Sequence, residues 1–261
     1  MALEIINRKI VGTIDNLEEK LNGNIPVDRL ELLYLVNSWG KNKYFEEHFE
    51  LDEHIENGYI PIEFSEKKCY DLSKLDTSKI TDMSQLFYYS EFNGDISNWD
   101  VSNVTNMQAM FAFTNDFNSD IGNWNTSNVT NMSEMFLYAT RFKSNIGNWD
   151  VSNVTSMSVM FHNASNFNQA LNDWDVSNVT DMRGMFRDTK EFNQALNNWN
   201  VSSVTNMSGM FCLARDFNQA LDKWDVSKVI DMNGMFQDAI AFTTKFNNGN
   251  PLPEDNNELK V

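Results

Sequence analysis

Residues 98–107 read NWDVSNVTNM and residues 173–182 read DWDVSNVTDM, and close relatives of this phrase recur through most of the chain. Its tryptophan returns every 25 residues, and a phenylalanine ahead of it keeps the same step from Phe92 to Phe242. A methionine pair followed by phenylalanine closes each unit, as in Met107, Met110 and Phe111. A fixed period of roughly 20 to 50 residues is typical of proteins whose units stack and bury their apolar side chains against each other. The sequence therefore predicts a repeat solenoid.

Within one unit we expect a short strand, a turn, and then a helical turn or short helix. The strand is predicted at residues 96–101, where Trp99 and Val101 face one way and Asp100 the other. The turn follows in SNVTNM. Segments such as residues 132–139 (MSEMFLYA) place Met and Phe at helical spacing.

Three regions are predicted. Residues 1–70 lack the repeat and form a helical N-terminal domain that caps the first coil, with helices at 15–23, 27–40 (capped by Asp28) and 43–58. Residues 71–245 form a solenoid of about seven coils, of which the first, at 75–87, departs from the consensus as terminal repeats do. Residues 246–261 form a flexible polar tail.

The net charge of −17 argues against a nucleic-acid partner, which needs a basic surface. No apolar stretch is long enough for membrane insertion, and the N-terminus shows no signal-peptide core. We find no nucleophile elbow, phosphate loop, dinucleotide fingerprint or zincin helix, so we expect no enzyme and no cofactor. His48 and Asp52 stand four residues apart, but two ligands are too few for a metal site.

The wording WDVSNVTNMSxMF followed by FNQAL resembles the 25-residue repeat of BspA-like leucine-rich-repeat surface proteins, found in bacterial surface proteins and mycoplasma-type lipoproteins. The resemblance covers about residues 71–245. It implies a leucine-rich-repeat-like solenoid and a role in adhesion or protein recognition at a cell surface, and it brings no catalytic residues. Because no export signal is visible, a cytoplasmic location stays open beside the cell surface.

Two columns of equivalent residues stand out. The tryptophan column is a structural ladder: Trp99, Trp124, Trp149, Trp174, Trp199 and Trp224. The residues that follow it form an acidic column, which is either a solvated face that bonds to turn amides or a recognition strip for a basic or donor-rich partner, with calcium binding a minor alternative. This candidate recognition strip is Asp100, Asn125, Asp150, Asp175, Asn200 and Asp225.

The five residues after each methionine pair and its phenylalanine vary between units, at 112–116, 137–141, 162–166, 187–191, 212–216 and 237–241. One changing loop per coil indicates either recognition or drift. The first functional hypothesis is a non-enzymatic adhesion or protein-binding module. The alternative is an intracellular interaction protein, such as a regulator, effector or virus-encoded decoy, and ice binding by the threonine column at Thr105 is a distant third. The partner's identity and the oligomeric state are not indicated.

Overall fold

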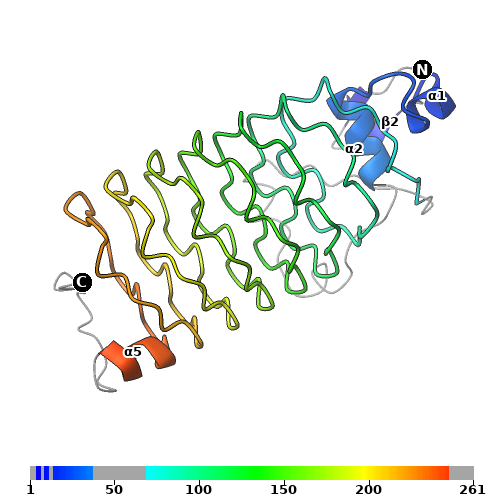
Figure 1. The fold of residues 1–261 in the computed structure, drawn as a ribbon. Coiled ribbons are helices and arrows are strands. Elements are labelled where there is room, and N and C mark those ends of the chain that lie inside the picture. Colours follow the sequence, from blue (N-terminus) through cyan, green and yellow to red (C-terminus); the bar gives the residue numbers. More distant parts are fainter. Residues whose placement is uncertain (1–3, 7–8, 12–13, 38–68, 247–261) are drawn as a thin grey trace.

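Consecutive 25-residue units lie side by side in one row in the computed structural model, which describes residues 4–6, 9–11, 14–37 and 69–246 (Figure 1). Isolated parallel β-bridges join equivalent residues of successive units, from Asp82–Asn106 and Asn106–Asn131 through to Asn206–Asp231. Each unit is therefore in register with the next, and side chains at equivalent positions of successive units lie beside each other.

Phenylalanine rings form the centre of the core. Within a unit, the ring centroids of Phe136 and Phe142 are 3.9 Å apart. Across units, Phe136 lies 5.6 Å from Phe111 and 5.7 Å from Phe161, with nearly parallel planes. All of these rings are fully buried. The repeated phenylalanines thus form continuous files of stacked rings along the row, an arrangement that adds to the gain from burial.

The tryptophan ladder is a second file in the same core. Trp149 and Trp174 belong to one cluster, each with 3% of its surface exposed, and the rings of Trp124 and Trp149 are stacked at 6.3 Å. The indole N–H of each tryptophan donates to the backbone carbonyl of an Ile or Leu in the preceding unit; for Trp149 the acceptor is Ile121, at 2.9 Å. The same bond recurs at all six positions. A buried ring therefore also satisfies a backbone acceptor of its neighbour.

Local backbone structure differs from the expected strand and helix. Residues 97–98 and 133–138 form turns, and the β-bridges lie outside both predicted segments, at Asn106 and Asn131. In residues 107–113, alternate N–H groups donate to the next unit, as in Met107 to Asn131 O (3.0 Å) and Ala109 to Ser133 O (2.9 Å). Between them, Met110 and Ala112 donate to the carbonyl three residues back, as in Met110 to Met107 O (3.2 Å), and Gln108 N donates to Asn106 Oδ1 (3.0 Å). Since half of the amides bond to the next coil, a continuous helix cannot form.

We call these backbone hydrogen bonds between successive units the interunit ladder. The interunit ladder requires left-handed backbone at two positions in every unit. In one unit they are Ala109 (φ 51°) and Phe113 (φ 60°), and in another Val159 (φ 59°) and Asn163 (φ 55°). Alanine, phenylalanine and valine rarely adopt positive φ. The interunit hydrogen bonds therefore override the local preference of these residues.

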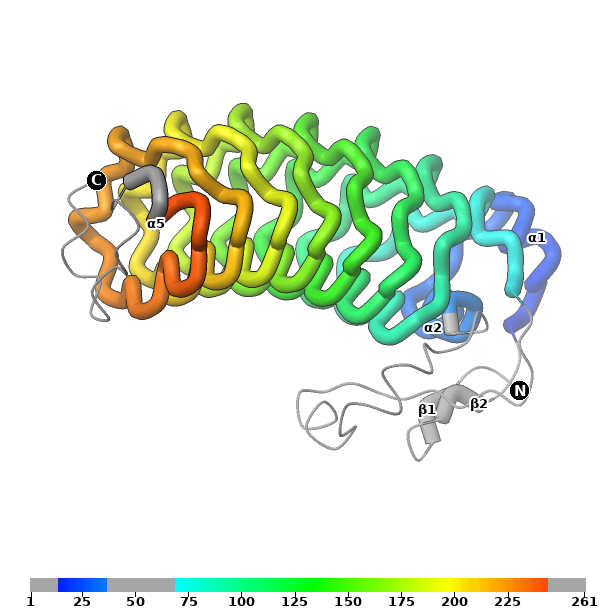
Figure 2. The backbone as a smooth tube through the Cα atoms, turned by 90° about the horizontal axis from the view of Figure 1, so that it is seen from below, coloured from blue at the N-terminus to red at the C-terminus, as the bar shows by residue number. Residues whose placement is uncertain are grey.

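Two short helices stand at the N-terminal end of the row (Figures 1 and 2). α1 spans Leu17–Leu21 and α2 spans Arg29–Asn37. Asp28 caps α2 by accepting from Glu31 N (2.9 Å), and the Glu31 carboxylate accepts in return from Asp28 N (3.0 Å). Leu32 and Leu35 of α2 are buried in the same cluster as the first coils.

An antiparallel pair of strands, β1 (Glu4–Ile6) and β2 (Lys9–Val11), was not expected from the sequence. The third predicted helix, at 43–58, lies outside the described residues, as does the predicted tail beyond residue 246. At the other end of the row the described chain finishes in α5 (Ile240–Phe246). In the described part of the chain, no helix has the length and apolarity to cross a membrane.

Arg29 of α2 occupies the place of a missing preceding coil. In later units the carbonyls of this ladder accept N–H groups from the coil before, as Asn106 O and Gln108 O accept from Met83 and Gln85. At the first unit the Arg29 guanidinium donates instead, from Nε to Asp82 O (3.0 Å) and from Nη2 to Ser84 O (2.9 Å). One side chain therefore satisfies two carbonyls at the open end of the row.

Substituting Arg29→Ala is expected to lower the free energy of unfolding by about 1–2 kcal/mol, because two charge-assisted hydrogen bonds are lost. Urea unfolding measures the change. Arg141→Ala is the matched control, since Arg141 forms only an exposed ion pair with Asp116 (2.7 Å), and it should cost less than about 1 kcal/mol. Equal losses in the two variants would contradict the capping role.

Candidate functional site

The candidate recognition strip forms an exposed column, and each of its side chains accepts a hydrogen bond within its own turn. All six residues, Asp100 to Asp225, are exposed. The Oδ1 atom of each accepts from the backbone N–H two residues along, as in Ser102 N to Asp100 (2.9 Å) and Ser127 N to Asn125 (3.2 Å). The other four make the same bond. Aspartate and asparagine are interchangeable here because both supply this acceptor.

The turn also lowers the pKa of three strip carboxylates, Asp100, Asp150 and Asp225. For Asp100, Asp150 and Asp225, the hydroxyl of the serine two residues on contributes most to the lowered pKa, followed by that serine's backbone N–H. Hydrogen bonds to the charged form favour it. Hydrogen bonds from the serine two residues on therefore favour the ionised form of these carboxylates. A partner that bound them would have to share the same oxygen atoms with that serine.

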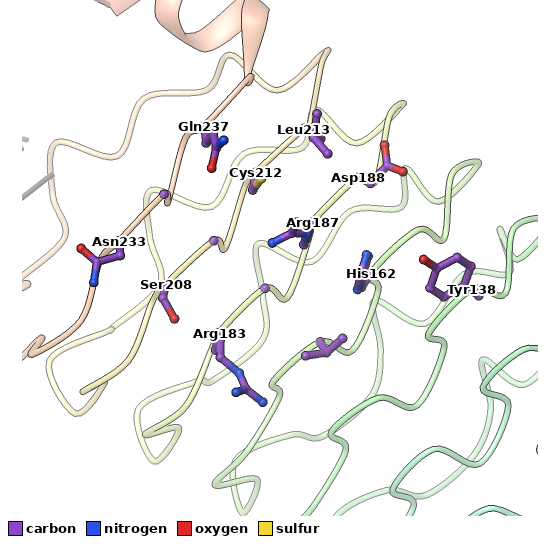
Figure 3. Close-up of a pocket in the computed structure, with 14 residues that line it drawn as sticks. Tyr138, His162, Arg183, Arg187, Asp188, Ser208, Cys212, Leu213, Asn233 and Gln237 are labelled. Atoms are coloured by element: carbon purple, nitrogen blue, oxygen red, sulfur yellow. The ribbon is translucent and has the colours of Figure 1, made fainter. Parts of the chain in front are cut away.

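A groove lies on a different face of the row, where the variable positions meet (Figure 3). It has a volume of about 550 Å³ and is lined by residues of five successive units, from Tyr138 to Gln237. His162, Arg187, Cys212 and Gln237, each the first variable residue after a methionine–phenylalanine pair, line it. The structure thus brings the start of these variable segments together, while their third residues, such as Ala164 and Thr189, are fully buried in the core.

The two residues inside each methionine pair complete the groove, and the sequence reasoning missed them. Arg183 and Gly184 line it from one unit, and Ser208 and Gly209 from the next, followed by Asn233 and Gly234. A signal for them exists, since these two positions also vary between units: QA, SE, SV, RG, SG and NG. The glycines adopt positive φ (57°, 61° and 63°), the conformation that other units force on alanine or valine.

Toward the N-terminal end the same face becomes aromatic. Tyr89 and Phe113 stack at 4.7 Å, Phe113 and Tyr138 at 5.2 Å, and Tyr138 lies 5.3 Å from the ring of His162. Together with Tyr88, these rings belong to or pack against a second apolar cluster outside the main core. Burial raises the pKa of Tyr89 to about 12. One face therefore changes along its length from aromatic to polar and basic.

The electrostatics of the groove keep its histidine neutral. Burial, and next the positive charge of Arg187, lower the pKa of His162 to about 4, against the opposing effect of Asp188. Burial likewise raises the pKa of the Cys212 thiol. At neutral pH the groove therefore presents a neutral imidazole and a neutral thiol beside two arginines.

Metal binding finds no support from the described residues. No group of three or more His, Cys, Asp or Glu side chains within them could hold a metal ion. His48 and Asp52 lie outside the described residues. In the strip, the carboxylates stand one per unit with Asn at two of the six positions, a poor match to the six to eight oxygen ligands that calcium takes.

Comparison with curated proteins and with solved structures gave no match. A family model described as "Mycoplasma protein of unknown function, DUF285" matches the chain twice, over residues 62–173 and over residues 139–250. The two overlapping matches cover most of the repeats and more than half of the chain. The protein therefore belongs to the DUF285 family of repeat proteins.

Proposed function

We propose that this protein is a non-enzymatic protein-binding module, built as a leucine-rich-repeat-like solenoid of the BspA-like kind, whose recognition surface is the groove. The observation that carries the proposal is that constant and variable residues of each unit occupy different places. Constant residues form the ring files of the core, and variable residues converge on one groove of about 550 Å³. Scaffolds that keep a core and vary one face use that face for recognition.

The groove is a better candidate than the acidic strip. Strip side chains repeat the same two residue types and accept hydrogen bonds from their own turns, which accounts for their constancy. Groove side chains differ from unit to unit and include arginine, histidine, asparagine and glutamine. Diverse, exposed polar side chains are what discrimination between partners needs.

A photo-crosslinking amino acid placed at Gln237, which is exposed in the groove, tests the proposal. The control position is Asn148, exposed on another part of the row. Each protein is incubated with host-cell surface proteins and, separately, with extract of the producing cell. We expect saturable crosslinks from position 237, competed by unlabelled wild-type protein, and few from position 148. Equal labelling from both positions would remove the groove from consideration.

The cellular setting separates adhesion from the alternative, an intracellular interaction protein. The family resemblance favours the cell surface. Treating intact producing cells with protease distinguishes the two settings, since a surface adhesin is cleaved from outside and an internal regulator or effector is protected. Full protection would retain the binding function and replace adhesion by the intracellular role.

A further inference from the structure

The floor of the groove is a trough made by three glycines in successive units. Gly184, Gly209 and Gly234 occupy the position held by Ala109, Glu134 and Val159 in earlier units. A Cβ atom on Gly209 would stand 3.7 Å from Arg187 Nη1, and one on Gly234 would stand 3.3 Å from Gln237 Oε1. At these three positions the backbone itself forms part of the groove lining, so an extended ligand that runs from unit to unit can approach it without meeting a side chain.

Within the part of the chain that the structure describes, the guanidinium groups of Arg183 and Arg187 have no carboxylate partner. Both side chains are exposed, and among the described residues neither forms an ion pair or a side-chain hydrogen bond. Asp188, the acid next in sequence, lies 3.9 Å from Lys190 instead. Arg29 and Arg141, by contrast, pair with Asp82 and Asp116.

This absence of pairing matters because acids outnumber bases in the chain by 37 to 20. The described lining of the groove holds these two unpaired arginines and one carboxylate, that of Asp188, so the groove has a local excess of positive charge on an acidic molecule. Guanidinium groups bind carboxylates through two parallel hydrogen bonds, with more geometric specificity than an ammonium group. The net charge of −17 repels every anion at long range, so binding of an anion depends on close contact with the two guanidinium groups.

Neutral donors and acceptors flank the arginines. Ser208, Asn233 and Gln237 line the groove on successive units. Amide and hydroxyl side chains can both donate to and accept from a peptide backbone. A cavity of about 550 Å³ is within the usual range for specific ligand sites, and it suits a few residues of an extended chain.

We propose that the groove binds an extended acidic segment of a protein partner, whose carboxylates pair with Arg183 and Arg187 while its backbone lies over the glycine trough. This assignment rests on the proposed protein-binding function and specifies the ligand's chemistry. It predicts binding that weakens as salt concentration rises, since the arginines are exposed to solvent.

Selection of a random-peptide display library against the full-length protein tests the assignment. Selected peptides are synthesised, with copies in which every Asp and Glu is replaced by Asn and Gln. Affinities are measured for the wild type, for the Arg183→Gln/Arg187→Gln double variant, and for the Arg141→Gln control. We expect acid-rich peptides whose affinity falls at least roughly tenfold in the double variant and in the amide copies, and is unchanged in the control.

A second readout is the NMR titration of His162. A carboxylate bound beside Arg187 should raise the pKa of His162 from its value of about 4, because a nearby negative charge favours the imidazolium. Equal thermal midpoints for the wild type and the double variant establish that folding is intact.

The outcomes separate this assignment from the binding function. Selected peptides that contain no acids, and that bind the double variant as well as the wild type, would overturn the acidic ligand and leave protein binding in place. Retention of nucleic acid in the groove, in place of peptide, would also overturn it. Failure of the wild type to retain any peptide, together with equal crosslinking from positions 237 and 148, would overturn both.

Discussion

Replacing Phe161 by alanine is expected to lower the free energy of unfolding by about 3–5 kcal/mol, the usual range for a fully buried phenylalanine. Its ring is completely buried and lies 4.1 Å from Phe167 within its own unit. It also stacks on Phe136 at 5.7 Å and on Phe186 at 5.6 Å. The cavity therefore opens at two interunit interfaces at once. Equilibrium denaturation in urea measures the loss.

Phe236→Ala is the matched control, because Phe236 belongs to the last unit of the row. Its ring has Phe211 at 5.4 Å and Phe242 at 3.9 Å, and in the described part of the chain, which ends at residue 246, no following unit stacks on it. In stacked repeats the stability is a sum of unit and neighbour terms, so a terminal ring contributes to one interface only. A loss at Phe161 no larger than at Phe236 would show that the ring files do not join the units energetically.

Much of the core could be predicted because the periodic residues report burial directly. The tryptophans, the methionine pairs and the phenylalanines that recur every 25 residues are buried almost without exception. Asp28 followed by Glu31 likewise indicates the start of a helix, and both halves of that capping box form. In these cases one residue type has one structural role, and sequence reasoning is sufficient.

The backbone of the repeat could not be predicted in the same way. Met107, Met110 and Phe111 have helical spacing, yet their segment alternates between bonds to the next coil and bonds three residues back. Local preference argues against positive φ at Ala109 or Phe113. Only the interunit ladder imposes it, and a ladder between residues about 25 apart leaves no local trace. The residue types that suit this geometry are glycine, asparagine and aspartate, which stand at six of the positive-φ positions of the repeat: Gly184, Gly209, Gly234, Asn163, Asp188 and Asp238.

Only part of the groove lining could be predicted from the sequence, for a related reason. The variable segments after each methionine pair were identified, but which of their residues point outward depends on the alternating backbone. As a result Ala164 and Thr189, which look variable, belong to the core, whereas Arg183 and Gly209, inside the methionine pair, line the groove. The acidic strip was the more obvious pattern because its residues repeat, and its repetition is explained by the Asp-x-Ser turn.

The interunit ladder can be interrupted by removing one backbone N–H group, that of Val159. Val159 has φ 59° and donates its N–H to Arg183 O at 2.7 Å. Proline has no N–H and holds φ near −65°. Val159→Pro is therefore expected to cost on the order of 3 kcal/mol or more, through the lost bond and the forced change of backbone. Urea unfolding gives the loss, and hydrogen exchange should show the weakest protection in the units on either side.

Val159→Gly separates the backbone effect from the side chain. Glycine adopts positive φ without strain, as it does at Gly184, Gly209 and Gly234. Relief of a strained valine, typically about 1–3 kcal/mol, outweighs the loss of packing by a side chain that is only partly buried against the second cluster. We therefore expect a small gain in stability from glycine and a large loss from proline at the same position. Similar losses from both would mean that the valine side chain, and not the interunit ladder, holds this segment in place.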